Sequence, residues 1–324
     1  MKNITLLLVS LLFTIPLTAQ QSDDEQWKEY YADKGIKSQT QWNHKYNGDK
    51  VREEGYKNLS KIFDENGNII EEIYYRQGSV YQKMSYKYNK EGKKIQSLNW
   101  KLDDGKKKIL FKQDIEYEDG KKIREVRYNG SNLTVFNYTY DKDKDNKLGK
   151  ITKYNDRGKV EQNREFSYEG NKTIVKISGP NGQIEGYIEN FYNSENKLTK
   201  TVDYDENHNE INRLSYKYDE QGREIEKAKY IKGDFAYKEN YRYGEDGLLK
   251  EVLHEEPEDN EYKNNMYEYD QQGNLLEEQW YDNHPEKYSK KTYHYNDDGI
   301  LKKVDVYYAL YNYKIQYQYT YEYY

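Results

Sequence analysis

Three alternating aspartates, Asp141, Asp143 and Asp145, are the residues of this chain whose type and spacing best suit metal binding. Alternate carboxylates in a short loop can converge on one hard cation, and Ca²⁺ takes oxygen ligands of this kind. A helix-flanked calcium loop would place glycine directly after the third aspartate and a bidentate glutamate at its end, where this chain has Asn146 and Thr152. The sequence therefore supports a calcium candidate, with a solvent-exposed hairpin tip as the favoured interpretation and no other cofactor expected.

The other residue types give no catalytic arrangement. The chain has no cysteine, which excludes thiolate catalysis, disulfides, cysteine-ligated zinc and a lipoprotein anchor. The histidines form no close ligand pair; they are His44, His208, His254, His284 and His294. No Gly-x-Ser-x-Gly elbow or phosphate loop occurs, and carboxylates are so numerous that a glycosidase pair could be drawn anywhere. We expect no enzymatic activity.

The N-terminal residues predict export. Residues 1–19 have the parts of a signal peptide, namely Lys2, the apolar run from Leu6 to Leu17, and the small residue Ala19. A retained anchor helix is the alternative, but polar residues 20–24 end the apolar run abruptly. No later stretch is apolar enough to cross a membrane as a helix. The mature chain is expected to be secreted, periplasmic or at the cell surface.

The composition indicates a β-rich protein whose interior is built from tyrosine. Of the 324 residues 34% are charged, but 40 are tyrosines, and disordered chains are poor in aromatics. Tyrosine suits a half-buried strand because its ring packs while its hydroxyl stays hydrated. Acidic and basic residues are mixed, with a net charge of −6, so no basic stripe is available for nucleic acid.

A repeat of about 25 residues organises the chain after residue 61. Two tyrosines separated by one residue precede a turn that begins with Asp or Asn and ends with Gly, as in residues 216–222 (YKYDEQG). The first side chain of the turn can accept backbone N–H groups, and the glycine supplies the positive φ of a type I turn closed by a bulge. Two copies carry Asn196 and His208 in place of the glycine, which predicts looser turns.

The predicted fold is all-β. Strand alternation places the paired tyrosines on one face and polar residues on the other, giving a long antiparallel meander of about twenty short strands, built from tandem hairpin repeats and coiled into an open sheet or spiral. Residues 20–60 would form an N-terminal cap and the first strands, 61–308 the repeats, and 309–324 a terminal tyrosine-rich strand. Residues 22–34 fit either a short helix across a sheet edge or a disordered leader. A transmembrane barrel is the alternative, and charges on both faces of residues 223–230 argue against it.

Segments 216–225 (YKYDEQGREI) and 267–275 (YEYDQQGNL) resemble the YD repeat of Rhs-type proteins. The core of that repeat is Tyr-Asp, two variable residues, Gly, a polar residue and then an apolar one. The resemblance covers roughly residues 61–301, strongly after 204 and weakly between 117 and 196, where residues 141–145 lengthen one turn. It implies an extracellular β-sheet that coils into a shell or spiral on bacterial surface and toxin proteins. Full shells use far longer chains, so encapsulation is not expected here.

These observations favour a secreted, non-enzymatic repeat protein that acts as a scaffold or binding module at the cell surface or in the periplasm. Its partner would be a protein or a cell-surface glycan, because aromatic rings stack on sugar faces and line protein interfaces. Two alternatives stay open: an extracellular glycan hydrolase, and a toxin-associated or immunity-type repeat protein. A binding site is expected where the repeat breaks, near residues 141–149, Asn196 or His208.

Overall fold

The computed structural model describes residues 27–103, 105–141, 145–258, 260–281 and 287–324. The predicted signal peptide, residues 1–19, lies outside them. The strands are β1 (Ile36–Asn47), β2 (Lys50–Val51), β3 (Tyr56–Phe63), β4 (Ile69–Arg76), β5 (Ser79–Tyr88), β6 (Lys94–Asp103), β7 (Lys106–Glu118), β8 (Lys121–Asn129), β9 (Asn132–Asp141), β10 (Lys147–Tyr154), β11 (Val160–Glu169), β12 (Lys172–Ser178), β13 (Ile184–Tyr192), β14 (Leu198–Tyr204), β15 (Glu210–Tyr218), β16 (Glu224–Ile231), β17 (Asp234–Tyr243), β18 (Leu249–Glu255), β19 (Tyr262–Tyr269), β20 (Leu275–Tyr281), β21 (Tyr288–Tyr295), β22 (Leu301–Tyr308) and β23 (Tyr313–Tyr323).

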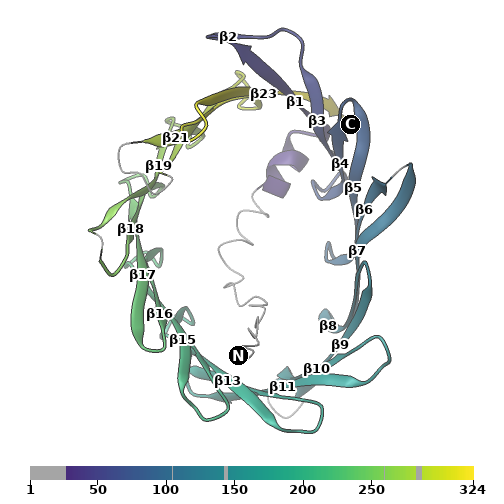
Figure 1. Ribbon diagram of the computed structural model, residues 1–324, viewed down its shortest axis with the longest axis vertical. Helices are drawn as coiled ribbons and strands as arrows, with labels where there is room; N and C mark the ends of the chain where they lie inside the picture. The colour runs from purple at the N-terminus through teal and green to yellow at the C-terminus, as the bar shows by residue number, and fades with distance from the viewer. Residues whose placement is uncertain (1–26, 104, 142–144, 259, 282–286) are drawn as a thin grey trace, which may run out of the picture.

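The sheet closes on itself, and this corrects the expected open sheet or spiral (Figure 1). Neighbouring strands pair antiparallel along the chain, and the last strand, β23, pairs with β1 from Ile36↔Tyr323 to Lys45↔Ile315. β1 pairs with β3 on its other side, so 22 strands form a barrel and the short β2 pairs only with β1. Closure supplies hydrogen-bond partners to both edges that an open sheet would expose.

Most turns with the repeat motif lie at one end of the barrel, and turns 155–158 and 205–208, at the other end, have the same backbone hydrogen bonds. We call the end with turns such as 64–67, 219–222 and 296–299 the repeat end, and the end with turns such as 77–78, 232–233 and 309–312 the far end. Odd-numbered strands from β3 to β23 run toward the repeat end, because each hairpin reverses the chain. One repeat of about 25 residues therefore corresponds to two strands of the barrel wall.

The turns that carry the repeat motif form as the sequence predicts, both at the repeat end and in the turn of His208 at the far end. Asp219 accepts the N–H groups of Gln221 (3.0 Å) and Arg223 (2.9 Å), and Gly222 has a φ of 76°. Asn196 and His208 adopt φ values of 58° and 63° and keep the same backbone hydrogen bonds as the glycine-containing turns. The expected loosening of these two turns is therefore not observed.

The paired tyrosines face the inside of the ring. The helix of residues 27–33 lies within the ring (Figure 1), and its Tyr31 stacks on Phe63 at 4.0 Å between ring centroids. Phe63 therefore faces inward, and the antiparallel register carries this face around the barrel. The last inward-facing aromatic of each odd-numbered strand from β3 to β23 belongs to an inner row at the repeat end; its members are Phe63, Tyr88, Tyr117, Tyr140, Tyr168, Tyr192, Tyr218, Tyr243, Tyr269, Tyr295 and Tyr321.

Eight hydroxyl groups of this row link a hairpin to the preceding one. The Tyr218 hydroxyl on β15 donates to the carbonyl of Leu198 on the adjacent strand β14 at 2.7 Å. The same bond recurs from Tyr88 to Ile69, Tyr117 to Lys94, Tyr140 to Lys122, Tyr168 to Leu148, Tyr243 to Glu224, Tyr295 to Leu275 and Tyr321 to Leu301. The tyrosine before each turn is thus an architectural residue.

Replacing one of these hydroxyls should lower stability by a measurable amount. We expect Tyr218→Phe to reduce the free energy of unfolding by about 1 kcal/mol, because a part-buried hydrogen bond is lost. Urea unfolding followed by tryptophan fluorescence measures the change. Tyr269→Phe is the matched control, since the Tyr269 hydroxyl makes no hydrogen bond to another described residue, and an equal loss in both variants would contradict the assignment.

The N-terminal helix packs on the inner wall rather than across a sheet edge. The Tyr30 hydroxyl donates to the carbonyl of Gly299 (3.3 Å) and Lys34 Nζ to that of Asp298 (2.8 Å), which places the helix at the repeat end. A Cβ on Gly67 would lie 1.9 Å from the carbonyl oxygen of Lys28, so the turn of the first repeat must be glycine for the helix to dock. No helix among the described residues has the length and apolarity needed to cross a membrane.

Candidate functional site

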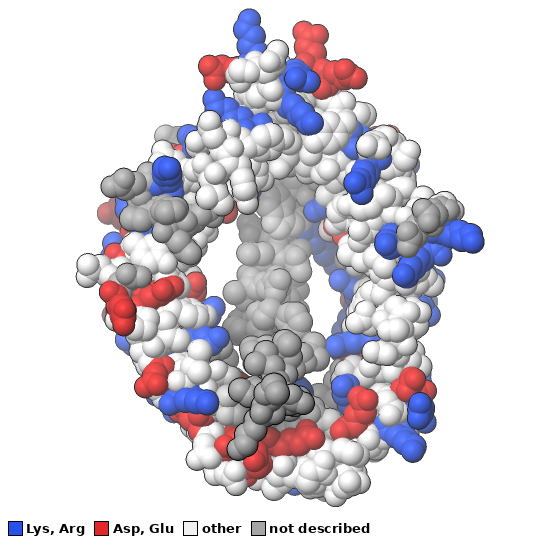
Figure 2. Space-filling view, viewed as in Figure 1, with Lys and Arg blue, Asp and Glu red and all other residues white. Residues whose placement is uncertain are grey.

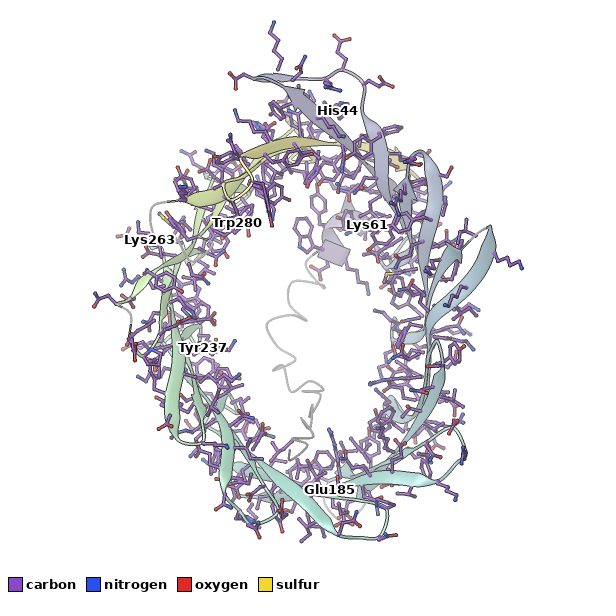
Figure 3. All side chains as sticks on the ribbon, in the orientation of Figure 1. His44, Lys61, Glu185, Tyr237, Lys263 and Trp280 are labelled. Atoms are coloured by element: carbon purple, nitrogen blue, oxygen red, sulfur yellow. The ribbon has the colours of Figure 1, made fainter. Side chains whose placement is uncertain are left out.

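The inner wall combines aromatic rings with charged side chains, and Figure 3 shows Lys61, Tyr237 and Trp280 on this side of the ring. Four inward tyrosines donate to glutamates of neighbouring strands or of their own strand: Tyr86 to Glu72 (2.8 Å), Tyr138 to Glu125 (3.0 Å), Tyr241 to Glu239 (2.9 Å) and Tyr293 to Glu278 (3.1 Å). Burial, and then the adjacent carboxylate, raises the pKa of each of these phenols. They therefore act as hydrogen-bond donors and not as bases.

Glu125 is the most completely enclosed charge of the wall, with a side chain that is 0% exposed. Gln113 donates to its Oε1 at 2.6 Å, Arg127 also binds Oε1, and Lys122 pairs with Oε2. Burial alone would raise the pKa of Glu125, but the bonds from Arg127 and Lys122 lower it to about 2. Every oxygen is committed to partners within the wall, so this cluster is structural.

A second cluster places two carboxyl groups close together on β16 and β17. Glu239 pairs with Lys227 (3.6 Å) and accepts the Tyr241 hydroxyl. Burial raises the pKa of Glu224, an effect that Lys227 partly offsets and Glu239 increases. A carboxylate beside a carboxyl group of raised pKa is the arrangement that glycoside hydrolases use. This cluster is therefore the place where the hydrolase alternative can be tested.

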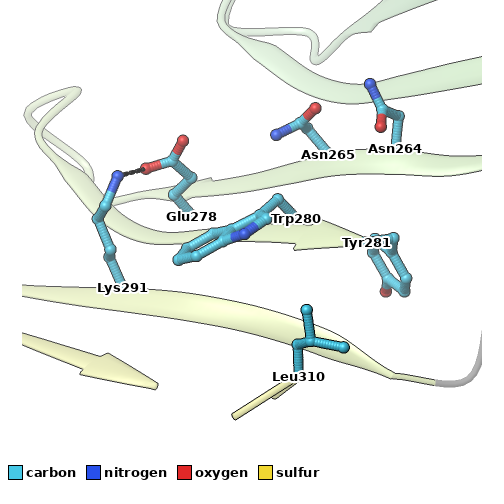
Figure 4. A pocket seen from close by; sticks show the side chains of 7 residues that line it. All are labelled: Asn264, Asn265, Glu278, Trp280, Tyr281, Lys291 and Leu310. Carbon is cyan, nitrogen blue, oxygen red and sulfur yellow. Dashed lines mark hydrogen bonds and ion pairs between the residues drawn. The ribbon is translucent and has the colours of Figure 1, made fainter. Parts of the chain in front are cut away.

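A hollow of about 640 Å³ opens on the wall formed by β19 to β22, near the far end (Figure 4). Trp280 lies at its centre, with the Tyr308 ring packed edge-on at 5.9 Å and Lys291 Nζ 5.2 Å from the indole. Lys291 also pairs with Glu278 at 2.8 Å. The remaining lining residues are Asn264, Asn265, Tyr281 and Leu310.

The local sequence explains how these side chains converge. Glu278 and Trp280 are two residues apart on β20 and so share the inner face. The antiparallel register sets Glu278 opposite Lys291 and Trp280 opposite Asn265 on the two neighbouring strands. The result is an aromatic face surrounded by amide, carboxylate and ammonium groups, in a volume within the range of about 300–1,000 Å³ common for small-ligand sites.

The outer wall has a different chemistry. Ion pairs between adjacent strands recur around it, among them Lys83–Glu71 (2.5 Å), Arg124–Glu116 (2.6 Å), Lys176–Glu165 (2.6 Å), Arg242–Glu251 (3.1 Å) and Lys290–Glu277 (2.8 Å). Figure 2 shows basic and acidic side chains interspersed around the circumference and open space within the ring. Charged pairs thus occupy the outward positions of strands on every side of the barrel.

Two of the three aspartates of the calcium hypothesis lie in the described part of the chain. Asp141 ends β9 and Asp145 lies in the following turn with a φ of 52°, while Asp143 is outside the described residues. Thr152 lies within β10, where its hydroxyl donates to Asn163 (3.1 Å). The described residues contain no group of three or more His, Asp or Glu side chains suited to a metal ion. Calcium binding stays a prediction.

The histidines that the structure describes are dispersed. His44 contacts the carbonyl of Arg52 at 3.0 Å, His208 packs against Tyr187, His254 stacks on Tyr237, and His294 contacts Asp305 at 2.8 Å. His284 lies outside the described residues. Sequence reasoning also missed the hollow at Trp280, which lies among regular repeats and not where the repeat breaks. The sequence signal for this hollow was the pair of Glu278 and Trp280, because no other repeat has a tryptophan at the position of Trp280.

No protein-family model and no curated protein matches the chain. Among solved structures it is similar to a porin-like protein from Bacteroides uniformis, with 11% identity, a TM-score of 0.34, and 89% of this chain and 96% of that chain covered. A porin-like protein from Bacteroides vulgatus gives 10% identity, a TM-score of 0.24, and coverage of 89% and 98%. The TcdB2-TccC3-Cdc42 structure gives 11% identity and a TM-score of 0.28, covering 76% of this chain and 19% of that chain. These identities and TM-scores are too low to bear on function, and the YD-repeat resemblance stays a prediction.

Proposed function

We propose that this chain is an exported, non-catalytic binding protein whose barrel holds a saccharide in the hollow at Trp280. One observation supports the proposal: the indole of Trp280 is surrounded by an amide, a carboxylate and an ammonium group, which belong to Asn265, Glu278 and Lys291. The C–H face of a pyranose packs on an aromatic ring, while its hydroxyls need both donors and acceptors at the edge. A purely apolar ligand would leave these polar groups unpaired, which costs free energy.

The outer wall supports a role in water or at a surface. Placing Lys or Arg at the middle of a bilayer costs about 2–4 kcal/mol per residue, and ion pairs such as Arg242–Glu251 and Lys290–Glu277 recur around the barrel. We therefore propose that the barrel works outside the hydrocarbon layer, in the periplasm, at the cell surface or secreted. Detergent-free extraction of the mature chain from washed cells tests this location, and strict dependence on detergent would contradict it.

Removing the indole should weaken saccharide binding. We expect Trp280→Ala to weaken binding by about tenfold or more, ~1.4 kcal/mol, because the central aromatic contact is lost. Binding is measured by calorimetry against a panel of purified glucose, galactose, mannose and N-acetylglucosamine oligomers. Trp100→Ala is the control, since Trp100 contacts Lys107 on another part of the barrel.

Absence of binding across the panel, or equal loss in both variants, would refute the saccharide site. The same panel tests the hydrolase alternative at the carboxyl cluster of Glu224 and Glu239. Release of reducing ends by the wild type, lost in Glu224→Gln, would replace the non-catalytic proposal with a hydrolytic one.

A further inference from the structure

The far end of the barrel carries most of the exposed apolar side chains. Sixteen large apolar residues among those described are exposed, and twelve of them lie at this end. They are spread over several parts of the rim, with Tyr56, Leu102, Leu133, Ile184, Ile231 and Tyr311 as examples. The other four are Trp27 in the helix and Leu276, Tyr323 and Tyr324 at the repeat end. A rim of this kind marks an interaction surface rather than scattered exposure, because apolar exposure is concentrated at one end.

Two groups of opposite charge project from the same rim. Lys106, Lys107 and Lys108 are exposed at the start of β7, beside the exposed Leu102. Glu256 and Glu258 are exposed in the connection between β18 and β19. Ten strands lie between the two hairpins in one direction around the ring and eight in the other, so the hairpins lie almost opposite each other, as β6 and β18 do in Figure 1.

We propose that two copies of this chain join through their far ends to form a symmetric dimer. A twofold axis across the far end, perpendicular to the line between the two charged groups, sets the lysines of each copy against the glutamates of the other. The charged contact is made twice, and the apolar rims meet between the two contacts. Such self-complementarity is what a twofold interface requires.

The charge arrangement favours a second copy over a membrane surface as the occupant. An anionic lipid surface would attract the lysine side of the rim and repel the glutamate side, which lies almost opposite. A second copy satisfies both sides at once. The dimer also joins the two barrel interiors into one chamber with the repeat ends outward. This inference does not depend on the saccharide proposal.

Charge reversal gives a decisive test in the full mature protein. Sedimentation velocity at low salt should show a dimer for the wild type. The variant Lys106→Glu/Lys107→Glu/Lys108→Glu and the variant Glu256→Lys/Glu258→Lys should each be monomeric, with the dissociation constant raised about tenfold or more by like-charge contacts. Mixing the two variants should restore a dimer, because every lysine group then faces a glutamate group. A monomeric wild type, or two variants that fail to associate when mixed, would overturn the proposal.

The apolar part of the rim is tested separately. Ile184→Ser/Ile231→Ser should weaken the dimer, whereas Leu276→Ser, a residue 37% exposed at the repeat end, should leave it unchanged. Far-ultraviolet circular dichroism of each variant confirms that the barrel is intact. Equal effects of both changes would count against the far end. Co-sedimentation of monomeric wild type with phosphatidylglycerol vesicles, lost in the lysine variant, would assign the rim to a membrane surface and also refute the dimer.

Discussion

Gln318→Pro is expected to prevent the barrel from closing. Gln318 lies in the middle of β23 and pairs with Trp42 on β1 and Lys303 on β22. Proline has no N–H and a fixed φ, so it cannot complete the ladder in a strand that is paired on both sides. The apolar cluster of Val304, Val306 and Ile315 depends on the same strand. We expect loss of near-ultraviolet circular dichroism, rapid proteolysis and aggregation through the freed edges.

Glu220→Pro is the matched control for this prediction. Glu220 occupies the second position of the turn from Asp219 to Gly222, where proline is favoured in a type I turn. The turn hydrogen bonds are donated by Gln221, Gly222 and Arg223, so the Glu220 N–H is not needed for them. This variant should unfold at the wild-type temperature. A folded, protease-resistant Gln318→Pro protein would show that an uninterrupted pairing of β1 with β23 is not required for closure.

Glu125→Ala should be among the most destabilising changes of a single inward side chain. It leaves Arg127 and Lys122 without their buried partner, and breaking a buried pair in this way costs about 3–5 kcal/mol. Glu116→Ala removes an exposed partner of Arg124 on the outer wall and should cost no more than about 1 kcal/mol. Urea unfolding at neutral pH measures both. Equal costs would show that the enclosed position of Glu125 has no energetic consequence.

Glu125 should also make the stability of the barrel depend on pH in the acidic range. The folded-state pKa of Glu125 is lowered from 4.5 to about 2, so the stability it contributes is present above pH 4.5 and lost as the pH falls toward 2. A difference of this size corresponds to about 3 kcal/mol. Glu224 has a raised pKa and acts in the opposite direction, since its contribution is lost as the pH rises through the folded value. The stability difference between wild type and Glu125→Ala should therefore shrink between pH 4.5 and 2, and a constant difference would contradict the assignment.

Local features of this barrel could be predicted from the sequence because their causes are local. The turn at Asp219 to Gly222 follows from one side-chain acceptor and one residue with positive φ. The inward face follows from strand alternation once the tyrosines are paired. Closure could not be predicted in this way, because it depends on contacts such as Gln39 with Tyr321, which are 282 positions apart. No pattern within the repeat specifies the angle between one hairpin and the next.

The hollow at Trp280 could not be predicted from the sequence for a related reason. Asn265, Trp280 and Lys291 belong to three different strands, and only their register makes them neighbours. No motif of fixed spacing connects them. The aspartates at 141, 143 and 145 have such a spacing, but Asp143 lies outside the described residues, so calcium binding by these three stays a prediction.

The antiparallel pairing of β1 with β23 restricts how the number of strands in such a barrel can change. β1 and β23 run in opposite directions, which requires an even number of strands in the ring. Loss or duplication of one hairpin of about 25 residues keeps that parity, while loss of a single strand would bring β1 and its partner together in parallel. Barrel diameter grows with strand number, so the number of hairpins sets the inner diameter. Homologous chains should therefore differ in length by whole hairpins.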